Sequence, residues 1–204
     1  MSASTRELLS VTASALQLSL GLVFLLAVVP KLRAPDAFSR TVAEYRIGPP
    51  AMAPALARGV IALEVFLAFA LLTGVLVAVA VPLALLILAG FAIAVGLNLH
   101  RRRTISCGCF GAKSETISGR SLARLGLLLA TVVALLALDA VVAPPPLLLG
   151  DAPGVGYLLQ VAGMSLALLL VGMWLLHLPE LWWVVGQLWR SSPRVEVEQR
   201  KEAA

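Results

Sequence analysis

The sequence predicts an all-α protein, a polytopic bundle of transmembrane helices. Of its 204 residues, 60% are hydrophobic and only 13% are charged, and the mean hydropathy of +0.95 excludes a single soluble domain. The apolar residues lie in unbroken stretches of about 20, the length that a helix needs to cross a hydrocarbon core roughly 30 Å thick. High hydrophobicity also excludes a disordered chain, and two cysteines are too few for a secreted disulfide scaffold.

The first predicted span covers about Leu8–Val29, and we expect it to end at Pro30 and Lys31. A cleaved signal peptide is the competing interpretation. The apolar stretch is longer than the usual 7 to 15 residues, and no small-x-small cleavage site precedes the basic segment, so we expect a retained membrane helix. The polar segment from Lys31 to Pro50 is predicted to be a short loop, with room for one amphipathic turn.

Two further spans, Ala51–Thr73 and Val75–Asn98, are predicted to form a tight hairpin that turns at Gly74. Pro82 is expected to kink the second of them. After a long polar segment, a fourth span is predicted over Ser121–Val142.

The C-terminal part is predicted to add a fifth helix, Tyr157–Leu178, and an interfacial segment, Glu180–Arg190, that contains three tryptophans. We therefore expect a four-helix membrane domain over residues 1–143, an additional helix with its tryptophan-rich segment over 144–190, and a disordered charged tail over 191–204.

The net charge of +5 predicts membrane topology rather than nucleic-acid binding, because the basic residues flank apolar spans instead of forming one soluble surface with stacking aromatics. Five helices place three basic segments on one face: residues 31–50, residues 100–120 and the C-terminal region. These hold 13 of the 16 Lys and Arg residues. Because positive loops stay inside, we expect the N-terminus outside and the cysteine loop at the cytoplasmic surface.

That cysteine loop carries the distinctive chemistry, the run from Ser106 to Gly111 that reads Ser-Cys-Gly-Cys-Phe-Gly. Cys107 and Cys109 can close only a small, strained ring, which suits thiol–disulfide exchange better than stapling. Gly108 removes a side chain that would hinder the ring. Arg103, its neighbours Arg101 and Arg102, and Lys113 would lower the pKa of the thiols wherever their charges approach the sulfur atoms.

Two other interpretations of the cysteines stay open. They can lie together by chance as two small apolar residues. They can also bind a metal with His100 as a third ligand, but structural zinc usually takes four protein ligands and the chain has no second Cys or His cluster. We therefore predict no metal site.

Charged residues inside the predicted spans are further candidates, because such groups are costly in a bilayer. Glu64 lies near the middle of the second span, roughly 9 Å deeper than Arg58 at 1.5 Å per residue. Arg124 begins the fourth span, so we expect Arg58 and Arg124 to converge with the thiols. Glu64 then either serves a proton or thiolate relay, or pairs with Arg124 or another polar group and ties helices together.

The order of these features resembles the methylamine utilisation protein MauE family, which belongs to the wider DoxX-like membrane proteins. The similarity covers about Leu8–Leu138, a four-helix DoxX-like core to which the fifth helix is an addition. It is carried by Lys31-Leu32-Arg33, Phe38, Tyr45, Glu64, Asn98, the motif Ser106-Cys107-Gly108-Cys109-Phe110-Gly111, and Arg124.

The resemblance implies a multi-pass protein of the bacterial cytoplasmic membrane that handles thiols and disulfides together with a thioredoxin-like partner. In that family this serves the maturation of disulfide-containing proteins such as methylamine dehydrogenase, and Cys107 and Cys109 would be the exchanging thiols. Such maturation is expected outside the cytoplasmic membrane, whereas the charge bias predicts a cytoplasmic cysteine loop. The two expectations therefore disagree about the side of the thiols.

The leading hypothesis is thus a thiol–disulfide oxidoreductase of the membrane. Because one cysteine pair holds only one disulfide, electrons must pass to a second carrier; a quinone is one candidate, although no cofactor motif is visible. The alternative is a non-enzymatic DoxX-like subunit or scaffold that anchors a redox complex in the lipid. A small-solute transporter that uses Glu64 and Arg58 is a third hypothesis.

Overall fold

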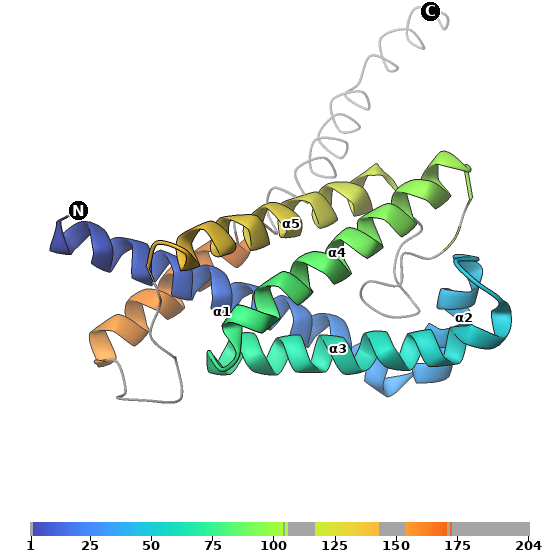
Figure 1. Ribbon diagram of the computed structural model, residues 1–204, viewed down its shortest axis with the longest axis horizontal. Helices are drawn as coiled ribbons and strands as arrows, with labels where there is room; N and C mark the ends of the chain where they lie inside the picture. The colour runs from blue at the N-terminus through green and yellow to red at the C-terminus, as the bar shows by residue number, and fades with distance from the viewer. Residues whose placement is uncertain (1, 104, 106–116, 143–153, 171, 173–204) are drawn as a thin grey trace, which may run out of the picture. The chain divides into compact units, whose positions relative to one another are not determined.

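The computed structural model describes residues 2–103, 105, 117–142, 154–170 and 172, and within these ranges all regular secondary structure is helical (Figure 1). Four of the described helices are long and apolar enough to cross a membrane. They are α1 (Ala3–Arg33), α3 (Ala53–Thr73), α4 (Val77–His100) and α5 (Gly119–Asp139). The predicted class, a polytopic helical membrane protein, is confirmed.

Helix α1 continues beyond the point where the sequence analysis ended it. Pro30 lies inside the helix, and the backbone N–H of Ala34 still reaches the Pro30 carbonyl at 3.2 Å. A proline inside a helix removes one N–H bond and crowds the carbonyl four residues earlier, but tertiary packing can offset these costs. The expectation that Pro30 and Lys31 end the span was therefore wrong.

The segment after α1 is mostly helical rather than a loop. Helix α2 (Pro35–Glu44) begins with Pro35 in its first turn, where the missing N–H costs nothing, and with Asp36 beside the positive end of the helix dipole. Its apolar face is buried, because α2 packs against α3. A short 3-10 turn, η1 (Pro50–Met52), then leads into α3.

The predicted hairpin between the second and third spans is present. Gly74 ends α3 with φ of 79°, a left-handed conformation that glycine adopts without strain, and its N–H donates to Ala70 O at 3.0 Å. Leu76, also left-handed with φ of 57°, precedes α4, and Pro82 lies within α4.

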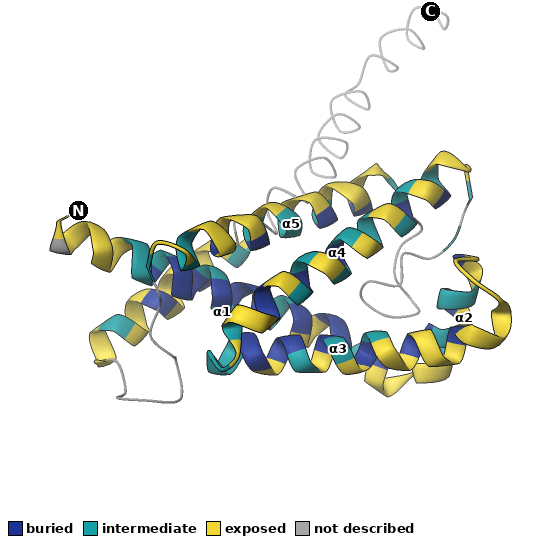
Figure 2. Ribbon diagram, viewed as in Figure 1, coloured by how far each residue is buried: buried dark blue, intermediate teal, exposed yellow. Residues whose placement is uncertain are grey.

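Helix α1 is the most buried of the four spans and packs on α3 and α5, while α4 packs on α5 and α3 (Figure 2). The residues of α1 that face the other helices are spaced three and four apart, as is typical where two helices pack together. They are Gln17, Gly21, Phe24, Val28 and Lys31. Large apolar side chains on the outer faces, such as Leu86 and Ile93 of α4, are exposed, as expected for a surface in contact with lipid.

Close approach and a hydrogen bond fix α1 against α3. A Cβ atom on Gly21 would lie 2.9 Å from Cγ of Leu72 and 3.1 Å from its backbone nitrogen. The amide of Gln17 donates to the carbonyl of Leu71 at 2.8 Å. Small residues and polar side chains in these roles are typical of helix contacts in membranes.

A further helix, Val155–Leu170, occupies the start of the predicted fifth span. Polar side chains connect it to α1: the hydroxyls of Ser14 and Tyr157 are 2.8 Å apart, and Ser165 donates to Ala15 O at 3.1 Å. Residues 171 and 173–204 lie outside the described ranges. The extension of this helix to Leu178, the tryptophan segment and the charged tail therefore stay predictions.

Candidate functional site

The described residues contain one buried ion pair, between Lys31 near the end of α1 and Glu64 in the middle of α3. Lys31 Nζ lies 2.5 Å from Glu64 Oε1, and the two side chains are only 1% and 2% exposed. A single charge at the centre of a membrane helix costs about 2.5–3.5 kcal/mol. The pairing offsets that cost, and it joins two helices that are separated by α2 in the sequence.

Aromatic rings complete the surroundings of the ammonium group. Lys31 Nζ lies 5.1 Å from the ring centroid of Phe38 on α2 and 5.7 Å from that of Phe91 on α4. At these distances the ring faces attract a cation. Four helices thus contribute to one charged site, with the lysine from α1, the carboxylate from α3 and one ring each from α2 and α4.

Two buried oxygen atoms near this site have no hydrogen-bond partner among the described residues. They are Glu64 Oε2 and Asn98 Oδ1. Buried polar atoms are nearly always paired, because an unpaired one loses the hydrogen bonds that water would have made. Each of these acceptors could therefore receive a hydrogen bond from a donor that approaches it.

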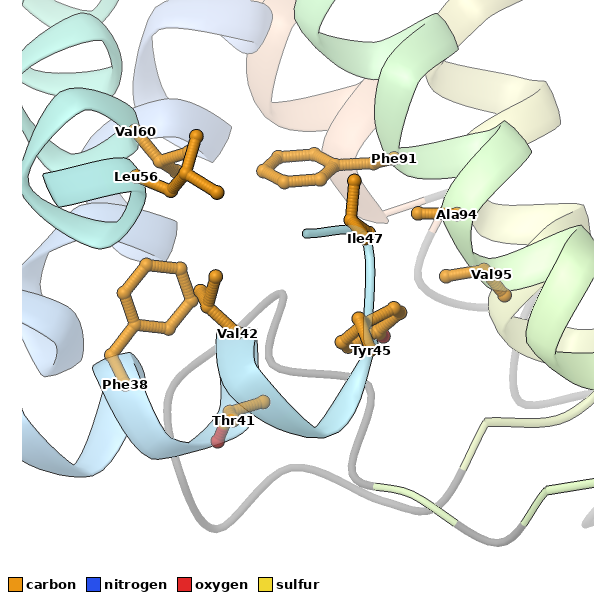
Figure 3. A pocket seen from close by; sticks show the side chains of 10 residues that line it. All are labelled: Phe38, Thr41, Val42, Tyr45, Ile47, Leu56, Val60, Phe91, Ala94 and Val95. Atoms are coloured by element: carbon orange, nitrogen blue, oxygen red, sulfur yellow. The ribbon is translucent and has the colours of Figure 1, made fainter. Parts of the chain in front are cut away.

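A cavity of about 140 Å³ lies beside the ion pair (Figure 3). The side chains that surround it are almost all apolar, and they come from α2, α3, α4 and the turn after α2. They are Phe38, Thr41, Val42, Tyr45, Ile47, Leu56, Val60, Phe91, Ala94 and Val95. Phe38 and Phe91 line the cavity and also face the lysine, so the cavity and the ion pair share an aromatic wall.

Asn98 connects α4 to the turn that follows α2. Its amide donates to Ala94 O at 2.9 Å and to Tyr45 O at 3.4 Å, which places the turn after α2 beside the last turns of α4. The end of α4 and the turn after α2 therefore lie together at one end of the bundle.

The backbone around Arg102 sets how the chain leaves α4. Arg102 has φ of 53°, its N–H donates to Leu99 O at 2.9 Å, and the N–H of Arg103 donates to Asn98 O at 3.1 Å. This is the Schellman pattern, with an arginine at the position usually taken by glycine. Beyond it, the N–H of Ile117 donates to Ile105 O at 2.9 Å, so the two ends of the cysteine loop are tied together.

The predicted site residues are only partly described. Cys107, Gly108, Cys109 and Lys113 lie outside the described ranges, and Arg103 lies just before them, half-buried.

The expected convergence of charges is only partly present. Arg58 is exposed, and its Nε donates to Pro54 O on its own helix at 3.2 Å. Arg124 is half-buried in the first turns of α5. Glu64 pairs with Lys31 rather than with Arg124, and this contact joins α1 to α3. The proposed relay role of Glu64 stays a prediction.

Lys31 is the site residue whose role the sequence analysis missed, because a lysine after a proline was counted as a loop charge. Its spacing from Phe24 and Val28, seven and three residues earlier, continues the buried seam of α1 and could have indicated a core position. Phe91, in contrast, had no signal that set it apart from the other apolar residues of its span.

Comparison with known proteins agrees with these observations. The family described as Methylamine utilisation protein MauE matches residues 9–138. The chain is also 36% identical over 93 residues to the Methylamine utilization protein MauE of Methylophilus methylotrophus, a match over 45% of this chain and 49% of that relative. The chain thus spans about half the length of the curated relative that it matches. No solved structure matches the chain.

The family match covers more than half of the chain. It includes α3, α4 and most of α1 and α5, and thus both partners of the buried ion pair. The chain is a multi-pass membrane protein and belongs to the methylamine utilisation protein MauE family.

Proposed function

We propose that this protein is a thiol–disulfide oxidoreductase of the bacterial cytoplasmic membrane that works through Cys107 and Cys109. The observation that carries the proposal is the Cys-Gly-Cys motif in a loop whose ends, Ile105 and Ile117, are held 2.9 Å apart by a backbone hydrogen bond. This hydrogen bond joins the two ends of the segment that contains the cysteines. Membership of the MauE family supports a role in methylamine utilisation.

The exchange proceeds through a mixed disulfide. A thiolate of the partner attacks the disulfide between Cys107 and Cys109 and releases one of these cysteines as a thiolate. The second thiolate of the partner then attacks the mixed disulfide. Two electrons and two protons pass from the partner dithiol to the cysteine pair, and the partner becomes a disulfide. The same steps in reverse reduce the partner.

The partner is a thioredoxin-like protein in this proposal, and the exchange serves the maturation of disulfide-containing proteins such as methylamine dehydrogenase. Because a single pair holds one disulfide, each turnover also requires a second two-electron carrier. Arg103, which precedes the cysteine loop, supplies positive charge that favours the thiolate form.

The test uses single serine variants of the full chain in native membranes, quenched with acid and then alkylated. Either single variant retains one thiolate that can attack the disulfide of an oxidised partner. The removed cysteine, Cys107 or Cys109, is the one that would resolve the mixed disulfide in that direction. One of the two variants is therefore expected to accumulate a covalent adduct with a thioredoxin-like protein that dithiothreitol releases. The double variant serves as the control without adduct. No adduct with either single variant, together with unchanged partner oxidation in both, would contradict the proposal.

The buried Lys31–Glu64 pair favours a second candidate function, because it ties helices without needing any thiol. In this case the protein is a non-enzymatic membrane subunit that anchors a redox complex, and the cysteines are incidental. In this case the variant that lacks both cysteines should still anchor the redox complex as the wild type does.

A further inference from the structure

The cavity beside the ion pair has the size and lining of a site for a single ring. Its volume is about 140 Å³. An apolar cavity of about 150 Å³ is large enough to bind benzene. Three of the side chains around it are aromatic, Phe38, Tyr45 and Phe91, and such side chains favour stacked or edge-to-face contact with another ring (Figure 3).

Three helix faces converge on this cavity, and two of them continue to a buried polar group. Along α3, Leu56 and Val60 line the cavity and Glu64 follows one turn later on the same face. Along α4, Ala94 lines the cavity and Asn98 follows one turn later. Neither Glu64 nor Asn98 is among the residues that line the cavity, so their buried oxygens Oε2 and Oδ1 lie beyond its wall.

The position of the cavity also allows entry from the membrane. Two of its lining residues, Ile47 and Leu56, are 66% and 43% exposed. Leu56 belongs to a membrane-spanning helix, so this edge of the cavity lies on the apolar outer surface. A ligand with a long apolar tail can leave that tail in the lipid while its ring occupies the cavity.

We propose that the cavity between α2, α3 and α4 binds the ring of a membrane quinone. The ring fits the volume, and the apolar tail fits the open edge. The aromatic side chains suit the faces of the ring, and the lining includes two residues with hydroxyl groups, Thr41 and Tyr45.

This assignment rests on the proposed function, because it identifies the second carrier which that function requires. In the complete step the dithiol of Cys107 and Cys109 becomes a disulfide, and its two electrons and two protons convert the quinone to the quinol. An acyl chain of a lipid is the competing occupant. It would use the volume but would leave the aromatic wall without a role.

The test measures binding of decylubiquinone to the full chain, purified in detergent, by equilibrium titration. Ala94→Phe places a ring in the cavity and is expected to weaken binding at least tenfold. Ile93→Phe adds the same ring at the neighbouring position, which is 63% exposed and faces away from the cavity, and should leave binding unchanged. Ala94→Val adds less volume and is expected to give an intermediate loss if the phenylalanine variant does not fold.

Two further arms separate the competing explanations. Decanol, which offers a chain but no ring, should not displace the quinone at equal concentration; equal displacement would show an acyl-chain site and overturn the proposal. Quinone binding that is unaffected by Ala94→Phe would overturn it as well. The variant without both cysteines should bind quinone like the wild type, so failure of thiol exchange and failure of quinone binding are observed independently.

Discussion

Lys31 and Glu64 form a buried ion pair between the end of α1 and the middle of α3, with Nζ and Oε1 2.5 Å apart. The pair is surrounded by the rings of Phe38 and Phe91, which also line the adjacent cavity. One contact thus serves two purposes. It fixes α1 on α3, and it places an ion pair behind the aromatic wall of the cavity.

Removing one partner of this pair should lower the stability of the protein more than replacing both partners. Lys31→Met leaves a buried carboxylate alone, and Glu64→Leu leaves a buried ammonium alone, so each is expected to cost about 3 kcal/mol of unfolding free energy. The double variant should recover most of that loss, because no unpaired charge remains. Unfolding in detergent, followed by circular dichroism, measures both. Arg33→Met, two residues further on and exposed, is the matched control with little effect. Additive losses in the double variant would contradict the coupling.

Gly21 should tolerate no side chain at the contact of α1 with α3. Gly21→Ala places a Cβ atom 2.9 Å from Cγ of Leu72 and 3.1 Å from its backbone nitrogen, so it is expected to destabilise the bundle by about 1–3 kcal/mol. Gly59→Ala is the same change in α3 where no neighbouring atom lies within 4 Å, and it should stabilise the helix by about 0.5–1 kcal/mol. The unfolding temperature should therefore fall for Gly21→Ala and rise for Gly59→Ala. A shift in the same direction for both would show that the close approach of Leu72 does not cause the effect at Gly21.

At the end of α4, a glycine in place of Arg102 is expected to stabilise the turn. Because Arg102 has φ of 53°, Arg102→Gly relieves a left-handed conformation and should stabilise this turn by about 1 kcal/mol. Arg101→Gly, at φ of −76°, has no such strain to relieve and serves as the control. Hydrogen exchange of the Arg103 amide, which donates to Asn98, reports the effect. Slower exchange in the first variant alone is expected; faster exchange there would refute the assignment.

The charge bias predicts that the cysteine loop faces the cytoplasm. In intact cells a membrane-impermeant maleimide should therefore leave Cys107 and Cys109 unlabelled, with or without mild reduction. Opening the membrane should make labelling possible, and the variant without both cysteines sets the background. Labelling in intact cells after reduction would place the pair outside, where maturation of disulfide-containing proteins is expected, and would overturn the topology argument.

The sequence predicted the four apolar spans and the turn at Gly74, because these depend on local properties, namely hydrophobic length and glycine's freedom at positive φ. The prediction that the first span ends at Pro30 and Lys31 was wrong, because the end of α1 depends on tertiary contacts. A proline inside α1 is tolerated in a packed helix, and a lysine near its end is buried because a carboxylate and two rings from other helices surround it.

Helix α2 shows the same limit at smaller scale. Its ten residues have the spacing of an amphipathic helix, yet a helix this short is only marginally stable unless α3 covers its apolar face.

The candidate site was predicted only in part. Glu64 was a candidate from the sequence, and Asn98 was named only among the residues that carry the family resemblance. The cavity could not be predicted, because it depends on how α2, α3 and α4 meet. The cysteine pair lies outside the described residues, so its predicted role stays a prediction.

The central claim, that Cys107 and Cys109 exchange electrons with a thioredoxin-like protein, is tested most directly by a transfer between purified proteins. The oxidised full chain is mixed with reduced thioredoxin, and free thiols in both are counted by maleimide mass shift over time. The account predicts that the chain gains two thiols as thioredoxin loses two, and that the variant without both cysteines gains none. A wild-type chain that gains no thiols while thioredoxin stays reduced would contradict it.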